Sequence, residues 1–207
     1  MNSKPQELEV SSEYHPLRPF LPQGCCLLML GSFPPARKRW AMEFFYPNFI
    51  NDMWRIFGIC FFGDKQHLVD EANRTFRRQE IEQLLTEQGI GLFDTATVIR
   101  RLKNTASDKD LEVVQPTDLT ALLQQIPQCQ AVCTTGQKAT DLFSAHFEIP
   151  QPQVGRFLDF TFEGRSMRHY RMPSSSRAYP MKVEQKAESY RQMFAEVLSP
   201  QHLPDFQ

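Results

Sequence analysis

Short apolar runs alternate with stretches of helical periodicity along most of this chain, and this alternation restricts the fold more than any other feature. The runs Cys25–Leu30, Ile90–Phe93 and Ala131–Thr134 are too short for helices and are typical of buried strands. Between the first two runs, the apolar residues within 50–57 recur at the i, i+3, i+4, i+7 spacing of an amphipathic helix. Strands that alternate with helices predict a parallel sheet covered on both faces.

We therefore expect one α/β domain with a three-layer α/β/α architecture and a mostly parallel central sheet of about four strands. The domain is predicted over residues 25–200. Residues 1–24 and 201–207 are expected to be tails, the first of them polar and lying over the domain.

The remainder of the chain divides into further predicted elements. A turn at Glu163–Arg165 joins the strand-like runs 156–162 and 166–172 into a hairpin. The polar stretch 63–79 is expected to be a loop, and the charged stretch 100–116 a connection. Further helices are expected at 81–88, 117–126, 136–143 and 183–198. Thr117 is the expected N-cap of the second of these.

The composition excludes several classes of protein. Lys and Arg number 23 against 24 Asp and Glu, so the chain is not a globally basic nucleic-acid binder, and any affinity for DNA must come from a local patch. No apolar stretch approaches the ~20 residues that span a membrane, and the polar N-terminus lacks a secretory apolar region.

The cysteines favour a reduced, intracellular protein, because they are odd in number and stand mostly in apolar runs. Cys129 and Cys133 are close in sequence, but no second Cys or His pair completes a metal site. We expect neither a metal ion nor another cofactor.

Two short loops follow strand-like runs that lie far apart in the sequence. The first loop, Gly31-Ser32-Phe33-Pro34-Pro35, follows Cys25–Leu30, and the second, Met172-Pro173-Ser174-Ser175-Ser176-Arg177, follows the hairpin. In an open parallel sheet, ligands bind in the crevice at the carboxyl ends of the strands, so the loops are expected to face one another over one site. The serine loop (Met172–Arg177) is small, hydroxyl-rich and set among arginines, which suits a phosphate backbone.

These segments resemble those of the uracil-DNA glycosylase superfamily. Met172–Ser176 is similar to the Met/Asn-Pro-Ser loop of the mismatch-specific uracil/thymine glycosylases. The first loop and the block Tyr46–Trp54 resemble the hypoxanthine/uracil branch, with Met53 at a position that is aromatic in that branch. Gly91–Asp94 resembles the family's strand that ends in an acidic residue. The similarities extend over most of the chain.

The resemblance implies a monofunctional DNA glycosylase that acts on uracil or hypoxanthine in base excision repair. A damaged nucleotide is flipped out of the duplex, and water hydrolyses its N-glycosidic bond. The enzyme can hold the water, donate hydrogen bonds to the leaving base and read the edge of the base. The implied partner is DNA with a damaged or mismatched base, and we expect a monomer in the cytoplasm, associated with the nucleoid if bacterial.

One position departs from the main pattern of the superfamily. The common families carry Asn or Asp at the third position of the first loop, where the side chain positions the water. Phe33 stands there in this chain and cannot polarise a water, although it can stack on a flipped base. The hypoxanthine/uracil branch shares this departure, and its replacement Asn maps onto Asn51. The alternative for Asn51 is a cap at the start of a helix.

The resemblance also implies residues that bind the base. Phe33 and an aromatic ring from Phe45 or Tyr46 would sandwich it, while the backbone of Gly31–Pro34 and Asp94 would read its edge. The alternatives are core packing for the aromatic residues and a turn cap for Asp94.

Contacts to the DNA backbone are implied for the serine loop. Ser174, Ser175 and Ser176 would bind phosphates, and Arg177 would pair with a phosphate or enter the gap left by the base. Met172 and Pro173 would shape the loop. The surrounding cations are candidates for a local basic patch: Arg165, Arg168, Arg171 and Lys182.

Two other functions stay open on the sequence alone. A protein with this fold can recognise damaged or single-stranded DNA without cleaving it, because Phe33 replaces the water-positioning group. A hydrolase of another class would use a serine of the serine loop as its nucleophile. Against the latter, the Gly-x-Ser-x-Gly pattern is absent and no His or acidic partner is evident.

Overall fold

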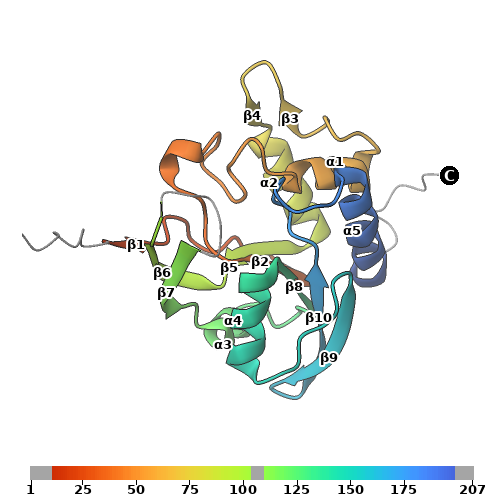
Figure 1. The fold of residues 1–207 in the computed structure, drawn as a ribbon. Helices are drawn as coiled ribbons and strands as arrows, with labels where there is room; N and C mark the ends of the chain where they lie inside the picture. Colours follow the sequence, from red (N-terminus) through yellow and green to blue (C-terminus); the bar gives the residue numbers. More distant parts are fainter. Residues whose placement is uncertain (1–10, 104–109, 199–207) are drawn as a thin grey trace, which may run out of the picture.

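The computed structural model describes residues 11–103 and 110–198, and its centre is a five-stranded sheet (Figure 1). Its strands, in spatial order, are β5 (Ile90–Asp94), β2 (Leu27–Gly31), β8 (Ala131–Thr135), β10 (Arg165–Met172) and β9 (Arg156–Phe162). All neighbouring pairs are parallel except β10 and β9, which form the predicted hairpin. The mostly parallel sheet is confirmed. The expected number of about four strands was too low, because both strands of the hairpin join the sheet.

The three strands that precede the site are buried throughout. Every residue of β2, β5 and β8 is shielded from solvent. Uninterrupted apolar sequence in such short strands is the expected result of a parallel sheet with helices against both faces.

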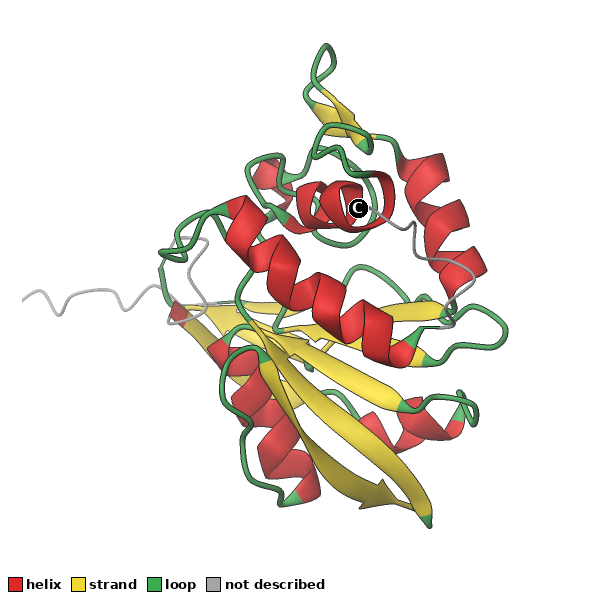
Figure 2. Ribbon diagram, turned by 90° about the vertical axis from the view of Figure 1, so that its right-hand side faces the viewer, coloured by secondary structure: helices red, strands yellow, loops and turns green. Residues whose placement is uncertain are grey.

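Helices lie on both sides of this sheet in Figure 2. They are α1 (Met53–Phe62), α2 (Arg78–Gln88), α3 (Leu119–Gln124), α4 (Gln137–Phe147) and α5 (Val183–Val197), with a short 3-10 turn η1 at Arg37–Arg39. The first and last of these pack on each other through aromatic rings, with the centroids of Phe57 and Phe194 5.2 Å apart. The packing brings the start of α1 and the loop before α5 to the same end of the sheet.

A second, three-stranded antiparallel sheet corrects the prediction for residues 100–116. It consists of β1 (Ser12–Tyr14), β6 (Ala96–Arg101) and β7 (Leu111–Pro116), in the order β1-β6-β7. The predicted connection is therefore largely strand, except for 104–109, which lies outside the described residues. Its exposed, charged faces carry no apolar run from which a strand could be predicted, and β1 comes from the segment 1–24 that was expected to be a tail.

Two smaller features also differ from expectation. The predicted loop over 63–79 contains a two-stranded sheet of β3 (Val69–Asp70) and β4 (Thr75–Phe76), and α2 already begins at Arg78. The cap of α3 is Asp118, whose carboxylate accepts the backbone N–H of Ala121 (2.9 Å), so the cap lies one residue after the predicted Thr117.

His169 is a buried structural residue in the middle of β10. Its Nε2 lies 2.9 Å from the hydroxyl of Thr134, and its ring packs on Phe143 with centroids 4.3 Å apart. Nδ1 has no hydrogen-bond partner among the described residues. Burial, reinforced by the charge of Arg171, lowers the pKa of His169 to about 3. The neutral ring is therefore the folded form at all ordinary pH values.

This burial makes the fold sensitive to acid. Below a pH of about 6.5 an unfolded histidine binds a proton that the folded His169 refuses until about pH 3, so stability falls as the pH falls between these values. From pH 7 to 5, His169 should cost about 2 kcal/mol of unfolding free energy. His169→Asn should remove this part of the loss, measured by urea unfolding at pH 7, 6 and 5. An unchanged pH slope in the variant would contradict the assignment.

Candidate active site

A pocket opens at the carboxyl ends of β2, β5 and β8, where the first loop and the serine loop meet. It is lined by Gly31, Ser32, Phe33, Pro34, Pro35, Phe45, Tyr46, Pro47, Asn48, Asn51, Asp94, Arg101, Leu111, Thr135, Ser174, Ser175 and Ser176. The pocket thus gathers all the predicted base-binding residues, the predicted catalytic Asn51 and the three serines. Met172, Pro173 and Arg177 do not line it.

Gly31 and Asp94 face each other at the ends of β2 and β5, where they are partners in the parallel register. A Cβ at position 31 would overlap Oδ1 of Asp94, so glycine is what lets the carboxylate lie beside β2. Two hydroxyls fix the backbone at these strand ends. Thr95 donates to the carbonyl of Gly31 (3.0 Å), and Thr117 donates to the carbonyl of Asp94 (2.7 Å). Asp94 is therefore a buried carboxylate with a fixed backbone.

His15 contacts Asp94 from the N-terminal segment, which the pairing of β1 with β6 brings to the pocket. Its Nε2 lies 2.8 Å from Oδ2 of Asp94, and both side chains are almost completely buried. The ring contacts Phe93 and, edge-on, Phe33, with centroids 4.7 and 5.2 Å away. His15 cannot be recognised from the sequence, because a lone histidine in a polar segment belongs to no local pattern.

Aromatic side chains form a further part of the lining. Phe33 and Phe45 are buried, and the indole N–H of Trp54 donates to the carbonyl of Phe45 (3.1 Å). The hydroxyl of Tyr46 lies 3.3 Å from that of Thr135. Burial, with the nearby charge of Asp94, raises the pKa of Tyr46, so its phenol stays neutral.

Tyr46 also has an unusual backbone conformation, with a φ of 49°. This left-handed region costs a residue with a side chain about 1–2 kcal/mol. The surrounding contacts must offset this cost, and strained residues of this kind gather at functional sites.

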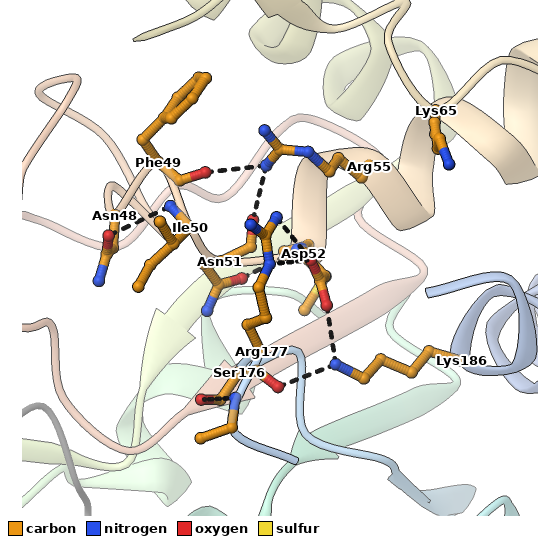
Figure 3. A network of polar contacts seen from close by, with 12 residues as sticks. Asn48, Phe49, Ile50, Asn51, Asp52, Arg55, Lys65, Ser176, Arg177 and Lys186 are labelled. Carbon is orange, nitrogen blue, oxygen red and sulfur yellow. Dashed lines mark hydrogen bonds and ion pairs between the residues drawn. The ribbon is translucent and has the colours of Figure 1, made fainter. Parts of the chain in front are cut away.

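Asn51 lies two residues before α1, whose N-cap is Asp52, and is half-buried at the edge of the pocket. Its Oδ1 accepts the backbone N–H of Met53 (2.9 Å), which is the capping contact proposed as the alternative to catalysis. Figure 3 shows its amide nitrogen on the other side from this bond. A carbonyl oxygen has two lone pairs, so the capping bond leaves one acceptor site and both N–H donors. The capping contact and a role in the pocket are therefore compatible.

A buried ion pair ties the start of α1 to the serine loop and to α5 (Figure 3). Asp52 Oδ2 lies 2.9 Å from the ammonium of Lys186, a fully buried residue of α5. The same ammonium donates to the carbonyl of Ser176 (2.8 Å), and the backbone N–H of Asp52 donates to the carbonyl of Ser175 (2.9 Å). This network holds the serine loop against Asn51.

Arg177 binds this network rather than the pocket. Its guanidinium lies 3.2 Å from Oδ1 of Asp52, and 53% of its side chain is exposed. Arg177 therefore lies outside the pocket, on the side of a second, more open hollow. That hollow is lined by Phe49, Ile50, Asp52, Arg55, Lys65, Gln66, Glu71, Arg74, Arg177, Met181, Lys182, Val183 and Glu184.

The rest of the serine loop is held by its own backbone. Met172 is buried, and the carbonyl of Pro173 accepts the hydroxyl of Tyr190 (2.9 Å), so both residues support the loop from below. The side chain of Met172 does not reach solvent, so a direct contact with DNA is not open to it, and its predicted role of shaping the loop stays a prediction. The Oγ atoms of Ser174 and Ser176 accept the backbone N–H groups of residues 176 and 178 (3.2 and 3.3 Å).

The predicted basic patch is only partly assembled. Arg165 stands at the opposite end of β10 from the serine loop, where its guanidinium donates to carbonyls around α3, including that of Leu123 (3.2 Å). Arg171 donates to the carbonyl of Pro152 (3.1 Å). Lys182, in contrast, lines the second hollow beside Arg177. The two arginines serve the fold, because each guanidinium is tied to backbone carbonyls outside the hairpin and not to the serine loop.

Neither a metal cluster nor a membrane span is found in the described part of the chain. Within residues 11–103 and 110–198, no three His, Cys, Asp or Glu side chains are grouped so that they could hold a metal ion. Every helix described there is too short or too polar to cross a membrane.

The fold is similar to that of a protein of known structure. No family model and no curated protein matches the sequence. A solution structure described as that of a "putative uracil DNA glycosylase" from Methanosarcina acetivorans matches with a TM-score of 0.55 and 19% sequence identity. The match covers 86% of this chain and 96% of that one. At this identity the similarity establishes a shared α/β fold.

The ion pair below the serine loop should contribute strongly to stability. Lys186→Met leaves the buried carboxylate of Asp52 with Arg177 alone, which should lower the unfolding free energy by about 3 kcal/mol. The double variant with Asp52→Asn should lose less than the sum of the single changes. The measurement is denaturant unfolding of the single and double variants.

The exposed pair of Lys65 and Glu184, 3.2 Å apart, provides the matched control for the buried pair at 2.9 Å. Half of each side chain or more is exposed, so Lys65→Met should cost less than about 1 kcal/mol. Equal costs for Lys65→Met and Lys186→Met would show that burial gives the Asp52 pair no special weight.

Proposed function

We propose that the protein is a monofunctional DNA glycosylase that hydrolyses the N-glycosidic bond of a flipped, deaminated base, uracil or hypoxanthine, in base excision repair. The observation that carries the proposal is the pocket itself. The first loop, Asn51, Asp94 and the serine loop, four segments far apart in sequence, meet around one cavity. These are the segments in which the chain resembles the uracil-DNA glycosylase superfamily, and the fold it shares with the Methanosarcina protein supports the same class.

The lining suits a flat heterocycle. Phe33 and the pair Phe45–Tyr46 offer ring faces for a base, and stacking on aromatic rings contributes about 1–3 kcal/mol per base. Asp94 and the backbone of the first loop would read the edge of the base. Because Phe33 cannot hold a water, we assign the positioning of the water at C1′ to the amide of Asn51.

The DNA backbone would run across the serine loop. Ser174, Ser175 and Ser176 line the pocket, and the loop is fixed from below by Lys186. The second hollow adds Arg74, Arg177 and Lys182 beside it, which supplies local positive charge on a chain of net charge −1. Phosphate contacts of this kind weaken as salt rises, so binding should depend on ionic strength.

The finer assignments follow from this class. We assign the chain to the hypoxanthine/uracil or mismatch-specific branches, with a three-layer α/β/α fold in keeping with helices on both sides of the sheet. We propose that it acts as a monomer inside the cell, without a metal ion or other cofactor. The serine-nucleophile alternative gains no support, since two of the three loop hydroxyls accept hydrogen bonds from their own loop.

A second function is favoured by two observations. Phe33 stands where the common families carry the water-positioning residue, and Oδ1 of Asn51 already accepts the Met53 N–H. A member of this fold without any other water-positioning group would bind damaged DNA and release it uncleaved.

The decisive test is cleavage of labelled oligonucleotides that carry uracil, hypoxanthine, xanthine or a G·T mismatch, single- and double-stranded, followed by alkali. We expect strand breaks at uracil or hypoxanthine, and a loss of about 10²- to 10³-fold in kcat with Asn51→Ala, because the water is no longer held. DNA affinity should change little.

Asn51→Ser separates catalysis from capping. Serine retains an oxygen that can cap α1 but has no amide to reach the pocket. Loss of activity in both variants, with stability lost only in Asn51→Ala, would support the catalytic role. Full activity of Asn51→Ser would reduce Asn51 to a cap. Salt-sensitive binding by the unaltered protein without any cleavage would favour the silent DNA-binding function.

A further inference from the structure

The carboxylate of Asp94 is shared between the pocket and His15. We propose that His15 is a positioning residue that holds Asp94 as a fixed hydrogen-bond acceptor, so that the pair selects bases by a ring N–H. The inference rests on the proposed function in one respect, namely that the pocket receives a base. It goes further in naming the recognised chemical group and the residue that sets the selectivity.

The contacts of His15 fix one oxygen of the carboxylate. Nε2 lies 2.8 Å from Oδ2 of Asp94, and Nδ1 lies 2.9 Å from the carbonyl oxygen and 3.2 Å from the backbone nitrogen of Leu17. With a proton assigned to Nε2, the ring donates to Asp94, while Nδ1 meets one of the two Leu17 groups, the carbonyl if it carries a proton and the N–H if it does not. The rings of Phe33 and Phe93 pack against the imidazole and prevent it from turning away.

The second oxygen of Asp94 is fixed as a consequence. Oδ1 lies directly over Gly31, where a Cβ would overlap it, and the carbonyl of Asp94 is held by Thr117. With its backbone fixed and Oδ2 bound to His15, the carboxylate cannot rotate. The pocket lining therefore contains an oriented carboxylate rather than a mobile one.

An oriented carboxylate distinguishes deaminated bases from their parents. An ionised carboxylate accepts hydrogen bonds and donates none. Cytosine and adenine present a lone pair at ring positions N3 and N1, which a carboxylate repels. Deamination converts each of these atoms into an N–H, in uracil and in hypoxanthine, which a carboxylate accepts. One acceptor can therefore serve a pyrimidine and a purine product and reject both parents.

His15 also couples this recognition to stacking. Its ring contacts Phe33 edge-on, and Phe33 lines the pocket where a base would stack. Loss of the imidazole would free Asp94 to rotate and would leave a gap behind Phe33. The expected result is weaker selectivity for the N–H edge, and not only weaker binding.

The test measures selectivity on oligonucleotides that the protein cannot cleave. Duplexes carry one 2′-fluoro-arabino nucleotide, a sugar that resists glycosidic hydrolysis, with uracil, cytosine, hypoxanthine or adenine as the base. Dissociation constants are measured for the unaltered protein, His15→Ala, His15→Gln and Tyr14→Ala. Tyr14 is the matched control, because it is on the same segment but is 76% exposed.

The unaltered protein and Tyr14→Ala should bind uracil and hypoxanthine at least about tenfold more tightly than cytosine and adenine, the value of one hydrogen bond to a charged group. His15→Ala should reduce this ratio to about threefold or less. His15→Gln, whose amide can donate to Asp94, should restore most of it. If His15→Ala does not fold, Asp94→Asn takes its place in the test. The amide both donates and accepts hydrogen bonds, so this variant should lower the preference for uracil and hypoxanthine over cytosine and adenine.

The inference is overturned if the unaltered protein shows no preference for the N–H bases, or if His15→Ala or Asp94→Asn keeps the full preference. Because these duplexes are not cleaved, the result is independent of turnover. Strand cleavage in the separate assay without N–H selectivity would remove the inference and keep the glycosylase function. Selective binding without any cleavage would keep the inference and remove the catalytic step.

Discussion

The buried contact between Asp52 and Lys186 holds the pocket together. It joins the start of α1, the serine loop and α5, and each of these contributes to or supports one side of the cavity. A charge pair without access to water is stabilising only when its remaining hydrogen bonds are satisfied, and here the carbonyl of Ser176 and the guanidinium of Arg177 satisfy them. The position of Asn51, one residue before Asp52, therefore depends on a contact that lies outside the pocket.

The hydrogen bonds of Asp94 fix a second part of the pocket. Asp94 is held through its carbonyl by Thr117 and through Oδ2 by His15, so its backbone and its carboxylate are both fixed. Between these two sets of contacts stand aromatic rings, and one of them, Tyr46, keeps a strained backbone. The geometry is that of a rigid receptor, in which the cost of orienting polar groups is met by folding rather than by binding.

The sequence allowed the central sheet and most of the pocket to be predicted, because both depend on local patterns. Uninterrupted apolar runs mark β2, β5 and β8, and residues at the ends of parallel strands must meet at one edge. The outer sheet was missed because β7 is largely exposed, and Arg101 of β6, which pairs with Glu13 of β1, looks like an ordinary surface charge in sequence. His15 was missed because its partner is 79 residues away, and no periodicity records such a contact. The opposite error concerned Arg165, which is adjacent in sequence to the hairpin turn and far from the serine loop in space.

The pairing of β1 with β6 has a consequence for the order in which the molecule is assembled. β1 is the earliest strand of the described chain, and it has no partner until β6 follows about halfway along the sequence. Contacts of such wide sequence separation form late, because a long loop must close before they are made. The side of the pocket that holds His15 against Asp94 depends on this pairing, since β1 carries His15 next to its last residue. During synthesis, β1 therefore stays without its partner strand until about half of the chain has been made.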